Sequence, residues 1–423
     1  MKRIGNIFDR VVDSDNLREA FLKASRGKRG RNDQRAFQAN LSREISVLRE
    51  GLLSGNYPVG NYSRFVIADP KRREIYAAEF RERVLHHALM NVCEPYFDRW
   101  LISHTYACRK GMGQLKAIAA ARMESRRCKW FLKCDIRKFF DNISHEGMVS
   151  LLRRKFKDER ILYWFEKILS TYETTSGRGL PIGNLTSQHF ANLYLDKLDR
   201  FVTARCFGYV RYMDDFVLWA DDKSLLRSVR DEIGGTVLPD LKLEFKPAPC
   251  INRTASGMDF LGARVFPQVV RASRRSIDRY ARKMRHYDYL LSSEQISELQ
   301  YQRKVTALTA FLMHFDTSGY RRQYFGCRRE ASGSNRVIRG GSYNNDAGNC
   351  TSSNCNNNNP SNNNDNNGFR LVCSAAPQGR TAAPVGIQFP EKRDKYTHAT
   401  SQVASCESHV ADSFAYTHRR LAT

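Results

Sequence analysis

Two adjacent aspartates, Asp214 and Asp215, lie between apolar runs in the stretch Tyr209-Val-Arg-Tyr-Met-Asp-Asp-Phe-Val-Leu-Trp-Ala220. β-rich runs on both sides of a short polar turn predict a β-hairpin with the two acids at its tip. Side chains alternate across a strand, so only one of the two aspartates is well placed to share a metal ion with a carboxylate from elsewhere. The rest of the chain must therefore supply that partner.

The candidate partner is Asp135, which ends the β-compatible run 129–135 and is followed by Phe139 and Phe140 in a predicted tight turn. Two carboxylates from separate strands of one sheet can hold two divalent ions, which activate an attacking hydroxyl and stabilise a leaving pyrophosphate. Only hard oxygen ligands converge there, so we expect Mg²⁺, with Mn²⁺ as the alternative. An isolated Asp-Asp turn can equally be a solvated hairpin tip, and the order of the other segments is what favours a catalytic site.

The net charge of the chain indicates which class of molecule it binds. The 423 residues include 69 Lys and Arg against 44 Asp and Glu, a formal charge of +25. Such a surface favours nucleic acid as the partner, and a basic soluble surface without one is the plainer alternative. The 11 cysteines form no Cys-x-x-Cys pair or zinc-ligand group, and no apolar run approaches the ~20 residues of a membrane span. We expect a cytoplasmic protein with reduced thiols and no membrane contact.

The remaining segments predict helices and hairpins in alternation. We predict helices in the regions 16–30, 36–54, 80–90, 146–172, 184–195, 225–233 and 272–325. β-rich runs flank the cationic turn Pro70-Lys-Arg-Arg73, which can close over a triphosphate, whereas a solvated turn is the plainer interpretation. We expect a strand at Leu241–Phe245 and a hairpin at Met258–Phe266. The basic helices after residue 272 would grip a nucleic-acid backbone.

With their segments in this order along the chain, residues from about 60 to 325 resemble a reverse transcriptase, in which fingers, palm and thumb follow one another in sequence. Tyr212-Met-Asp-Asp215 matches the most specific motif of that family, and Asp135 in Cys-Asp-Ile-Arg-Lys-Phe-Phe matches its first catalytic aspartate. The resemblance implies an α+β fold, a right-hand polymerase with a ferredoxin-like palm, fingers and a small helical thumb. It makes Asp135, Asp214 and Asp215 the catalytic residues. The metal ligands would be Asp135, Asp214 and the backbone carbonyl of Ile136.

The same resemblance assigns further roles. Lys71 and Arg73 match the fingers residues that bind the incoming triphosphate. Phe140 matches the aromatic residue that rejects a 2′-hydroxyl, although the phenylalanine before it leaves the choice open. Phe260-Leu-Gly262 matches the hairpin that supports the primer end, and Lys246 is a candidate for the lysine near the pyrophosphate.

The loop before the predicted helix at 184–195 distinguishes between subgroups of reverse transcriptases. Most reverse transcriptases carry Pro-Gln-Gly-Ser-Pro-x-Ser-Pro there, whereas this chain has Pro181-Ile-Gly-Asn-Leu-Thr-Ser-Gln188. Ile182 replaces a glutamine, and Gln188 replaces the last proline. This variant resembles the reverse transcriptases of diversity-generating retroelements, which copy a template RNA with errors opposite adenine in mutagenic retrohoming. The loop, including Gly183, would line the pocket of the template base and the incoming nucleotide, so the loss of a polar side chain there would weaken discrimination.

Composition changes after Glu330. An asparagine-dense run at 354–367 ends in Gly-Phe-Arg-Leu-Val-Cys373, which resembles the end of a formylglycine-generating-enzyme-type C-type lectin fold, the usual target of such elements. Asparagine codons begin with two adenines, so we interpret residues 331–373 as a translated template repeat, with an Asn-rich linker as the alternative. Residues 374–423 are polar and weakly patterned, and we expect them to be disordered.

We divide the chain accordingly into an N-terminal helical extension (1–60), fingers (61–130), palm (131–268, with fingers elements around 146–180), thumb (269–330), template-repeat-like segment (331–373) and tail (374–423). The implied partners are template RNA, a DNA or cDNA primer-template, deoxynucleoside triphosphates and a pentameric basic accessory protein, in a bacterial or phage-encoded system.

Two alternatives stay open. A group II intron or retron-like reverse transcriptase is disfavoured by Ile182, by Gln188 and by the lack of a zinc-bearing endonuclease segment. A non-catalytic nucleic-acid-binding protein with a lectin-like variable tail is disfavoured by the three aspartates and by the shortness of the tail.

Overall fold

The computed structural model describes residues 3–28, 30–68, 72–206, 208–247, 249–315 and 317, together with the backbone of four strands farther along the chain. It divides into two units. Among the described residues, the first unit comprises those up to 261 and 265–268, and the second comprises 262–264 and those from 269 onward. No helix among the described residues is long and apolar enough to cross a membrane.

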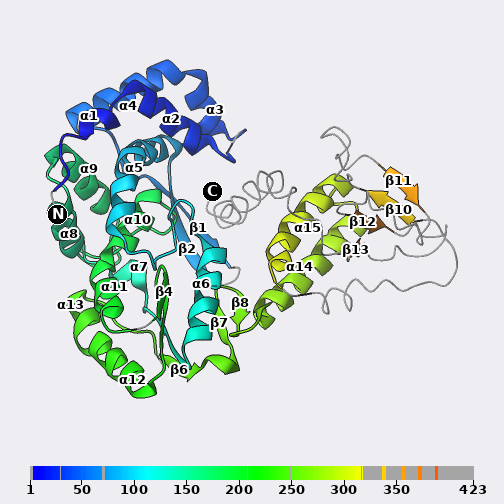
Figure 1. Cartoon of the computed structure of the whole chain (residues 1–423). Coiled ribbons are helices and arrows are strands. Elements are labelled where there is room, and N and C mark those ends of the chain that lie inside the picture. The colour runs from blue at the N-terminus through cyan, green and yellow to red at the C-terminus, as the bar shows by residue number, and fades with distance from the viewer. Residues whose placement is uncertain are drawn as a thin grey trace. The chain divides into compact units, whose positions relative to one another are not determined.

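The first unit begins with helices packed on one long helix (Figure 1). These are α1 (Phe8–Val11), α2 (Ser14–Ser25), α3 (Asn32–Ala39), α4 (Leu41–Ser54) and the long α5 (Phe80–Trp100). The rings of Phe21, Phe37 and Phe80 join α2, α3 and α5, with centroids 5.4 to 6.1 Å apart. Such aromatic pairs stabilise a core beyond their buried area. The helical spacing of residues 36–54 is therefore confirmed, although it spans two helices.

A two-stranded hairpin lies between α4 and α5 in the chain. Strands β1 (Tyr62–Ile67) and β2 (Arg73–Ala78) pair antiparallel, with Tyr62 opposite Ala78 and Ile67 opposite Arg73. The β-rich runs predicted around the cationic turn are thus confirmed. Residues 69–71 of the tip lie outside the described residues.

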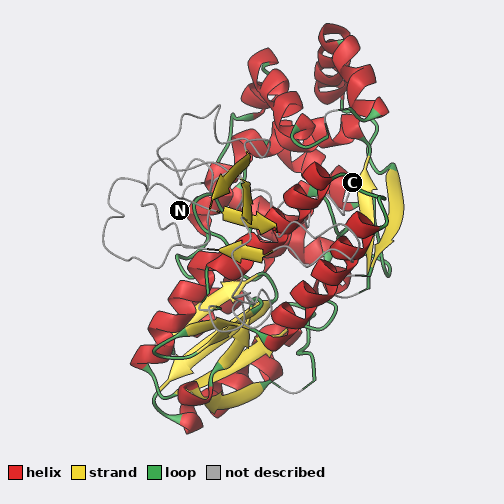
Figure 2. Ribbon diagram, turned by 90° about the vertical axis from the view of Figure 1, so that its right-hand side faces the viewer, coloured by secondary structure: helices red, strands yellow, loops and turns green. Residues whose placement is uncertain are grey.

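The central sheet has the strand order β4-β5-β3-β6. Its strands are β3 (Trp130–Asp135), β4 (Gly208–Tyr212), β5 (Asp215–Ala220) and β6 (Cys250–Arg253), and all neighbours pair antiparallel. Figure 2 shows these strands side by side with helices along them. The predicted hairpin at 209–220 is confirmed as β4 and β5.

The strand predicted at Leu241–Phe245 is wrong. Only Phe245 pairs there, in an isolated bridge to Ile136, and the edge strand is β6. The physical reason is local, because Lys242 has φ of 56° in the left-handed region and interrupts an extended backbone. Buried Leu243 explains the apolar spacing that suggested a strand.

Helices surround the sheet within the first unit. They are α6 (Gln114–Arg127), α7 (Phe139–Asn142), α8 (His145–Lys155), α9 (Glu159–Leu169), α10 (Leu185–Tyr194), α11 (Asp196–Thr203), α12 (Lys223–Glu232) and α13 (Leu238–Asp240), with a π-helical turn η1 (Ile233–Val237) and a 3₁₀ turn η2 (Thr254–Ser256). Helix α6 packs against β4 and β5, α12 against β3 and β5, and α10 against α5. One continuous core joins these elements, so the sheet is held from several sides.

The chain then continues through a short three-stranded sheet of order β7-β8-β9, with strands Met258–Phe260, Ala263–Val265 and Val270–Ala272. The predicted hairpin at Met258–Phe266 is thus confirmed. In the second unit α14 (Arg274–Ser292) packs on α15 (Glu298–Met313), where the Tyr301 hydroxyl donates to Asp288 at 2.6 Å. Most of the predicted helical region 272–325 is therefore confirmed as α14 and α15, whereas Ala272 ends β9 and a short turn separates the two helices.

Four further strands pair in the order β11-β10-β12-β13. They are β10 (Arg336–Arg339), β11 (Cys355–Asn358), β12 (Arg370–Cys373) and β13 (Gly386–Gln388). The other residues of 331–423 lie outside the described part of the chain, and with them most of what was predicted for the template-repeat-like segment and the tail.

Candidate active site

Three aspartates meet at one end of the central sheet. Asp135 is the last residue of β3 and lies opposite Asp215, the first residue of β5. Asp214 lies in the turn between β4 and β5, after Met213, whose φ of 57° places it in the left-handed region. The turn and the strand pairing thus bring together the three residues that the sequence predicted as catalytic.

The charges around the aspartates are not equivalent. Burial raises the pKa of Asp214, and the negative charge of Asp135 raises it further, while Arg73 and Lys246 act in the opposite direction. Burial also raises the pKa of Asp215 to about 6, against the stabilising charge of Lys133. Asp214 therefore lies within electrostatic reach of both Asp135 at the end of β3 and Arg73 at the start of β2.

Two lysines lie beside the carboxylates of Asp215 and Asp135. Lys133 Nζ lies 3.4 Å from Asp215 Oδ2, and Lys246 Nζ lies 3.0 Å from Asp135 Oδ2. The Lys246 N–H also donates to the backbone carbonyl of Asp135 at 2.8 Å. Lys246, predicted as a pyrophosphate ligand, is thus beside the first aspartate.

The residues at the sheet end fit a divalent cation that takes some of its oxygen ligands from the protein and the others from the substrate. Among the described residues, no group of three or more His, Cys, Asp or Glu side chains could hold a metal ion. The predicted ligand set needs only the carboxylates of Asp135 and Asp214 and the carbonyl of Ile136, and Mg²⁺ commonly takes its remaining ligands from water and phosphates. Like charges raise the pKa of Asp214, and a cation beside it would remove that repulsion.

The predicted nucleotide-binding residues differ in how far their side chains are exposed. Arg73 is exposed at the start of β2, and Lys71 lies outside the described residues. The two phenylalanines after Asp135 differ in burial. Phe139 is 2% exposed and belongs to the core, whereas Phe140 is half-buried and packs edge-on against it, with centroids 5.6 Å apart. Of the two rings, Phe140 is therefore the one with surface left to meet a nucleotide.

The loop 181–188 lies against β2 of the hairpin. Tyr76 N–H donates to the Ile182 carbonyl at 2.9 Å. Gly183 has φ of 117°, and a Cβ there would lie 2.9 Å from Ile75 Cγ2, so this close approach requires glycine. At the other end of the loop, Gln188 Oε1 accepts a hydrogen bond from Cys108 Sγ at 3.2 Å. Ile182 and Gln188 are thus held by different parts of the first unit.

The predicted primer-end residues make different contacts, through the side chain of Phe260 and through the backbone carbonyls of Leu261 and Gly262. Phe260 is 1% exposed, and Lys133 Nζ lies 5.8 Å from the centre of its ring. The Leu261 carbonyl accepts from Gln114 Nε2 at 2.7 Å. Gly262 has φ of 79° and its carbonyl accepts from Ser273 N–H and Ser276 Oγ. Phe260 thus ends β7, and Leu261 and Gly262 form the turn before β8. The role predicted for these residues stays a prediction.

A comparison with protein families decides the class of this site. Residues 71–265, which include all three aspartates, match the family model described as reverse transcriptase (RNA-dependent DNA polymerase). These residues are a reverse transcriptase domain. The match and the mixed helix and sheet architecture confirm the predicted α+β right-hand polymerase fold and the predicted enzyme class.

Several curated proteins are similar to this reverse transcriptase domain. Protein YkfC of Escherichia coli is 24% identical over 279 residues, which cover 54% of this chain and 72% of that protein. The group II intron-encoded protein LtrA of Lactococcus lactis is 28% identical over 173 residues, 38% of this chain and 28% of LtrA. The putative COX1/OXI3 intron 2 protein of Saccharomyces cerevisiae is 26% identical over 130 residues, 29% and 15% of the two chains. The chain therefore spans less than a third of these two intron proteins.

Among solved structures, apo telomerase from Candida tropicalis aligns with a TM-score of 0.42 and 11% identity, over 68% of this chain and 65% of that one.

Sequence reasoning missed a buried ion pair behind the reverse transcriptase aspartates. Arg211 of β4 and Asp199 of α11 are both fully buried and form two hydrogen bonds of 2.6 Å. Arg211 Nη1 also donates to the Met213 carbonyl in the turn at 3.2 Å and to Asn192 Oδ1 at 2.9 Å. The available signal was a lone charged residue within an otherwise apolar strand, which requires a buried partner.

Proposed function

We propose that this chain is an RNA-directed DNA polymerase of a diversity-generating retroelement, which copies a template-repeat RNA into cDNA with errors opposite adenine for diversification of a target protein gene. The register of Asp135 opposite Asp215, with Asp214 in the adjoining turn, is the observation that supports polymerisation. Divalent ions bound there would activate the primer hydroxyl and stabilise the leaving pyrophosphate.

The residues around the aspartates would handle the nucleotide. Arg73 lies within electrostatic reach of Asp214 and would bind phosphate oxygens of the incoming nucleotide together with Lys71. Lys246, beside Asp135, would exchange its ion pair for the pyrophosphate when the metal ions neutralise the carboxylates. The half-buried Phe140 would pack against the sugar.

The error-prone character rests on the loop 181–188. The Ile182 backbone is fixed to β2 by the hydrogen bond from Tyr76, so its side chain is held at a defined position next to the hairpin that would cover the nucleotide. An apolar side chain there offers no hydrogen bond to a base or sugar, and a site without polar contacts discriminates weakly.

Ile182→Gln is expected to lower misincorporation opposite template adenine by roughly tenfold, which corresponds to about one hydrogen bond of discrimination. The measurement is RNA-templated primer extension by the purified protein with sequencing of the cDNA, and errors opposite the other three bases serve as the internal control. Wild-type synthesis of cDNA tests the polymerase itself. An unchanged adenine error frequency in the variant would exclude the role of Ile182.

Phe140→Ala is expected to raise the relative kcat/KM for ribonucleotides over deoxyribonucleotides by about tenfold to a hundredfold, because the ring that would clash with a 2′-hydroxyl is removed. Single-nucleotide extension with matched dNTP and NTP pairs measures this ratio. Phe139→Leu is the control, since Phe139 is a core residue and its change should alter thermal stability without altering sugar selection. Equal ratios in wild type and Phe140→Ala would contradict the assignment.

A group II intron-type reverse transcriptase is the second candidate, favoured by the similarity to LtrA and to the yeast intron protein. The nucleotide sequence beside the gene separates the two candidates. A repeat that differs from the 331–373 coding segment only at adenines supports the retroelement, whereas flanking group II intron RNA supports the intron.

The remaining assignments follow from the proposed retroelement. Its partners would be the template RNA, the primer-template, deoxynucleoside triphosphates and a pentameric basic accessory protein, in the cytoplasm. The division into fingers, palm and thumb is likewise proposed, with the aspartates in the palm and α14 and α15 in the thumb.

A further inference from the structure

The end of helix α8 and the start of the chain together form a basic surface. Ile4 N–H donates to the Lys155 carbonyl at 2.9 Å, and Lys157 N–H donates to the Ile4 carbonyl at 2.7 Å. This pairing brings Arg3 beside α8, where Nε and Nη2 donate to the Phe156 carbonyl at 3.1 and 3.0 Å. The guanidinium of Arg3 is thus held by a backbone carbonyl and not by a carboxylate.

We call the cations Arg3, Arg154, Lys155 and Lys157 the α8 patch. None of the four forms an ion pair with a described carboxylate, although Lys155 Nζ lies 5.3 Å from the centre of the Trp100 ring. The neighbouring Arg153 is different, because it pairs with Glu159 and Glu166 of α9 at 3.3 and 2.7 Å. The patch therefore holds positive charge that the described part of the protein leaves uncompensated.

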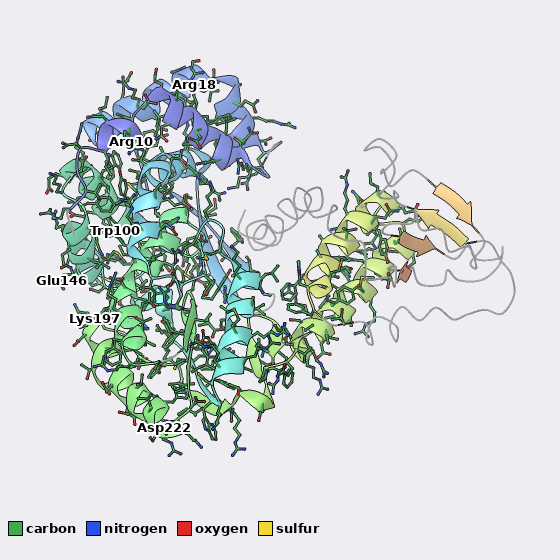
Figure 3. The ribbon with its side chains drawn as sticks, viewed as in Figure 1. Arg10, Arg18, Trp100, Glu146, Lys197 and Asp222 are labelled. Carbon is green, nitrogen blue, oxygen red and sulfur yellow. The ribbon has the colours of Figure 1, made fainter. Side chains whose placement is uncertain are left out.

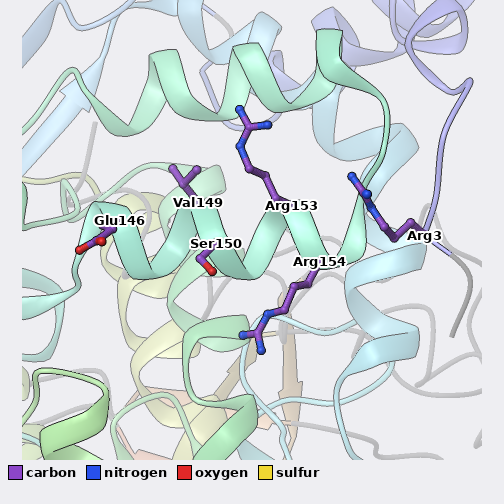
Figure 4. Close-up of a pocket in the computed structure, with 6 residues that line it drawn as sticks. All are labelled: Arg3, Glu146, Val149, Ser150, Arg153 and Arg154. Carbon is purple, nitrogen blue, oxygen red and sulfur yellow. The ribbon is translucent and has the colours of Figure 1, made fainter.

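A shallow, open pocket of about 570 Å³ lies at this patch, lined by Arg3, Glu146, Val149, Ser150, Arg153 and Arg154. Figure 4 shows Arg153 directed toward α9 and Arg154 leaving the opposite side of α8, with Arg3 entering from the N-terminal segment. Ser150 is one helical turn before Arg154, so its hydroxyl lies on the same face. Glu146, the one acid in the lining, is paired with Lys242 at 3.2 Å.

The pocket is separate from the polymerase site. Its lining contains none of the predicted catalytic, nucleotide-binding or primer-end residues. In Figure 3, Glu146 lies at the edge of the first unit. A ligand here would therefore not compete for the aspartates.

We propose that the α8 patch binds the phosphate backbone of an RNA, as a second contact for the template RNA that the proposed function requires. Two guanidinium groups and a hydroxyl at one pocket can donate to phosphate oxygens, and Arg does so in a bidentate manner. The fixed orientation of Arg3 reduces the entropy lost on binding. An acidic protein would need apolar anchors at the centre of its interface, and the pocket offers only Val149.

The test is a triple variant, Arg3→Gln, Arg154→Gln and Lys157→Gln, compared with wild type in binding to purified transfer RNA over a series of salt concentrations. The slope of log Kd against log salt concentration is expected to fall by about two. Each phosphate contact that is lost lowers this slope by about 0.7 to 0.9. Lys155 is kept because of its contact with Trp100.

A matched control removes the same charge elsewhere in the first unit, by Arg18→Gln, Arg26→Gln and Arg49→Gln, and should keep the wild-type slope. Equal slopes for all three proteins, or an equal fall in both variants, would overturn the proposal. Extension of a DNA primer on a short RNA oligonucleotide should be unchanged in the patch variant. If wild type fails to extend that primer, the proposed polymerase function fails, while the comparison of RNA affinities still tests the α8 patch.

Discussion

Asp214→Asn is expected to reduce primer extension on an RNA template by about 10³-fold. The substitution keeps the size of the side chain but removes the charge, and replaces one of the two oxygens, that would hold the divalent ions. Losing several kcal/mol of transition-state stabilisation corresponds to a factor of this order. Asp214 lies within electrostatic reach of Asp135 and Arg73, so the variant should also bind the incoming nucleotide differently. The measurement is single-turnover extension at saturating Mg²⁺.

Asp240→Asn is the control for this prediction, since Asp240 pairs with Lys197 at 2.6 Å on the surface and has no place at the sheet end. Its activity and thermal stability should match wild type, because exposed ion pairs contribute at most about 1 kcal/mol. An Asp214→Asn variant that folds normally and extends primers at the wild-type rate would exclude the two-metal assignment for Asp135 and Asp214.

The sequence predicted the hairpin and its chemistry because those features are local. An apolar run, a turn with two acids and a second apolar run determine β4 and β5 without reference to other residues. Asp135 was found in the same way, as a polar residue that ends a strand. The register of Asp135 opposite Asp215 could not be predicted in this way, because it depends on how β3 and β5 pair across the sheet.

Features that depend on tertiary contacts were predicted less well. The apolar residues of Leu241–Phe245 suggested a strand, but a left-handed Lys242 and the packing of Leu243 formed a turn instead. Lys133 is two residues before Asp135 on the same strand face, and this spacing was available as a signal for its pairing with Asp215. The partner of Arg211 could not be predicted from the sequence, because Arg211 lies in β4, Asp199 lies in α11, and no short-range pattern connects the two residues.

Loss of the buried ion pair between Arg211 and Asp199 is expected to destabilise the protein strongly. Arg211→Met should lower the free energy of unfolding by about 3–5 kcal/mol. The change leaves Asp199 charged and buried with only the Tyr209 hydroxyl, 2.8 Å away, as a partner. Chemical denaturation measures this loss. The control is Arg200→Met, because Arg200 pairs with Asp196 of the same helix α11 but is 57% exposed, so its loss should stay below about 1 kcal/mol.

A second substitution separates the structural role of Arg211 from its role at the site. In Arg211→Met with Asp199→Asn the buried charge is gone and the amide can still accept from Tyr209, so about half of the lost stability should return. Primer extension should remain reduced by roughly a hundredfold, because the Met213 carbonyl in the aspartate turn still lacks its donor and small misplacements of reacting groups cost about that much. If stability and activity recover together, Arg211 acts only through folding; if stability alone recovers, Arg211 is a positioning residue for Asp214.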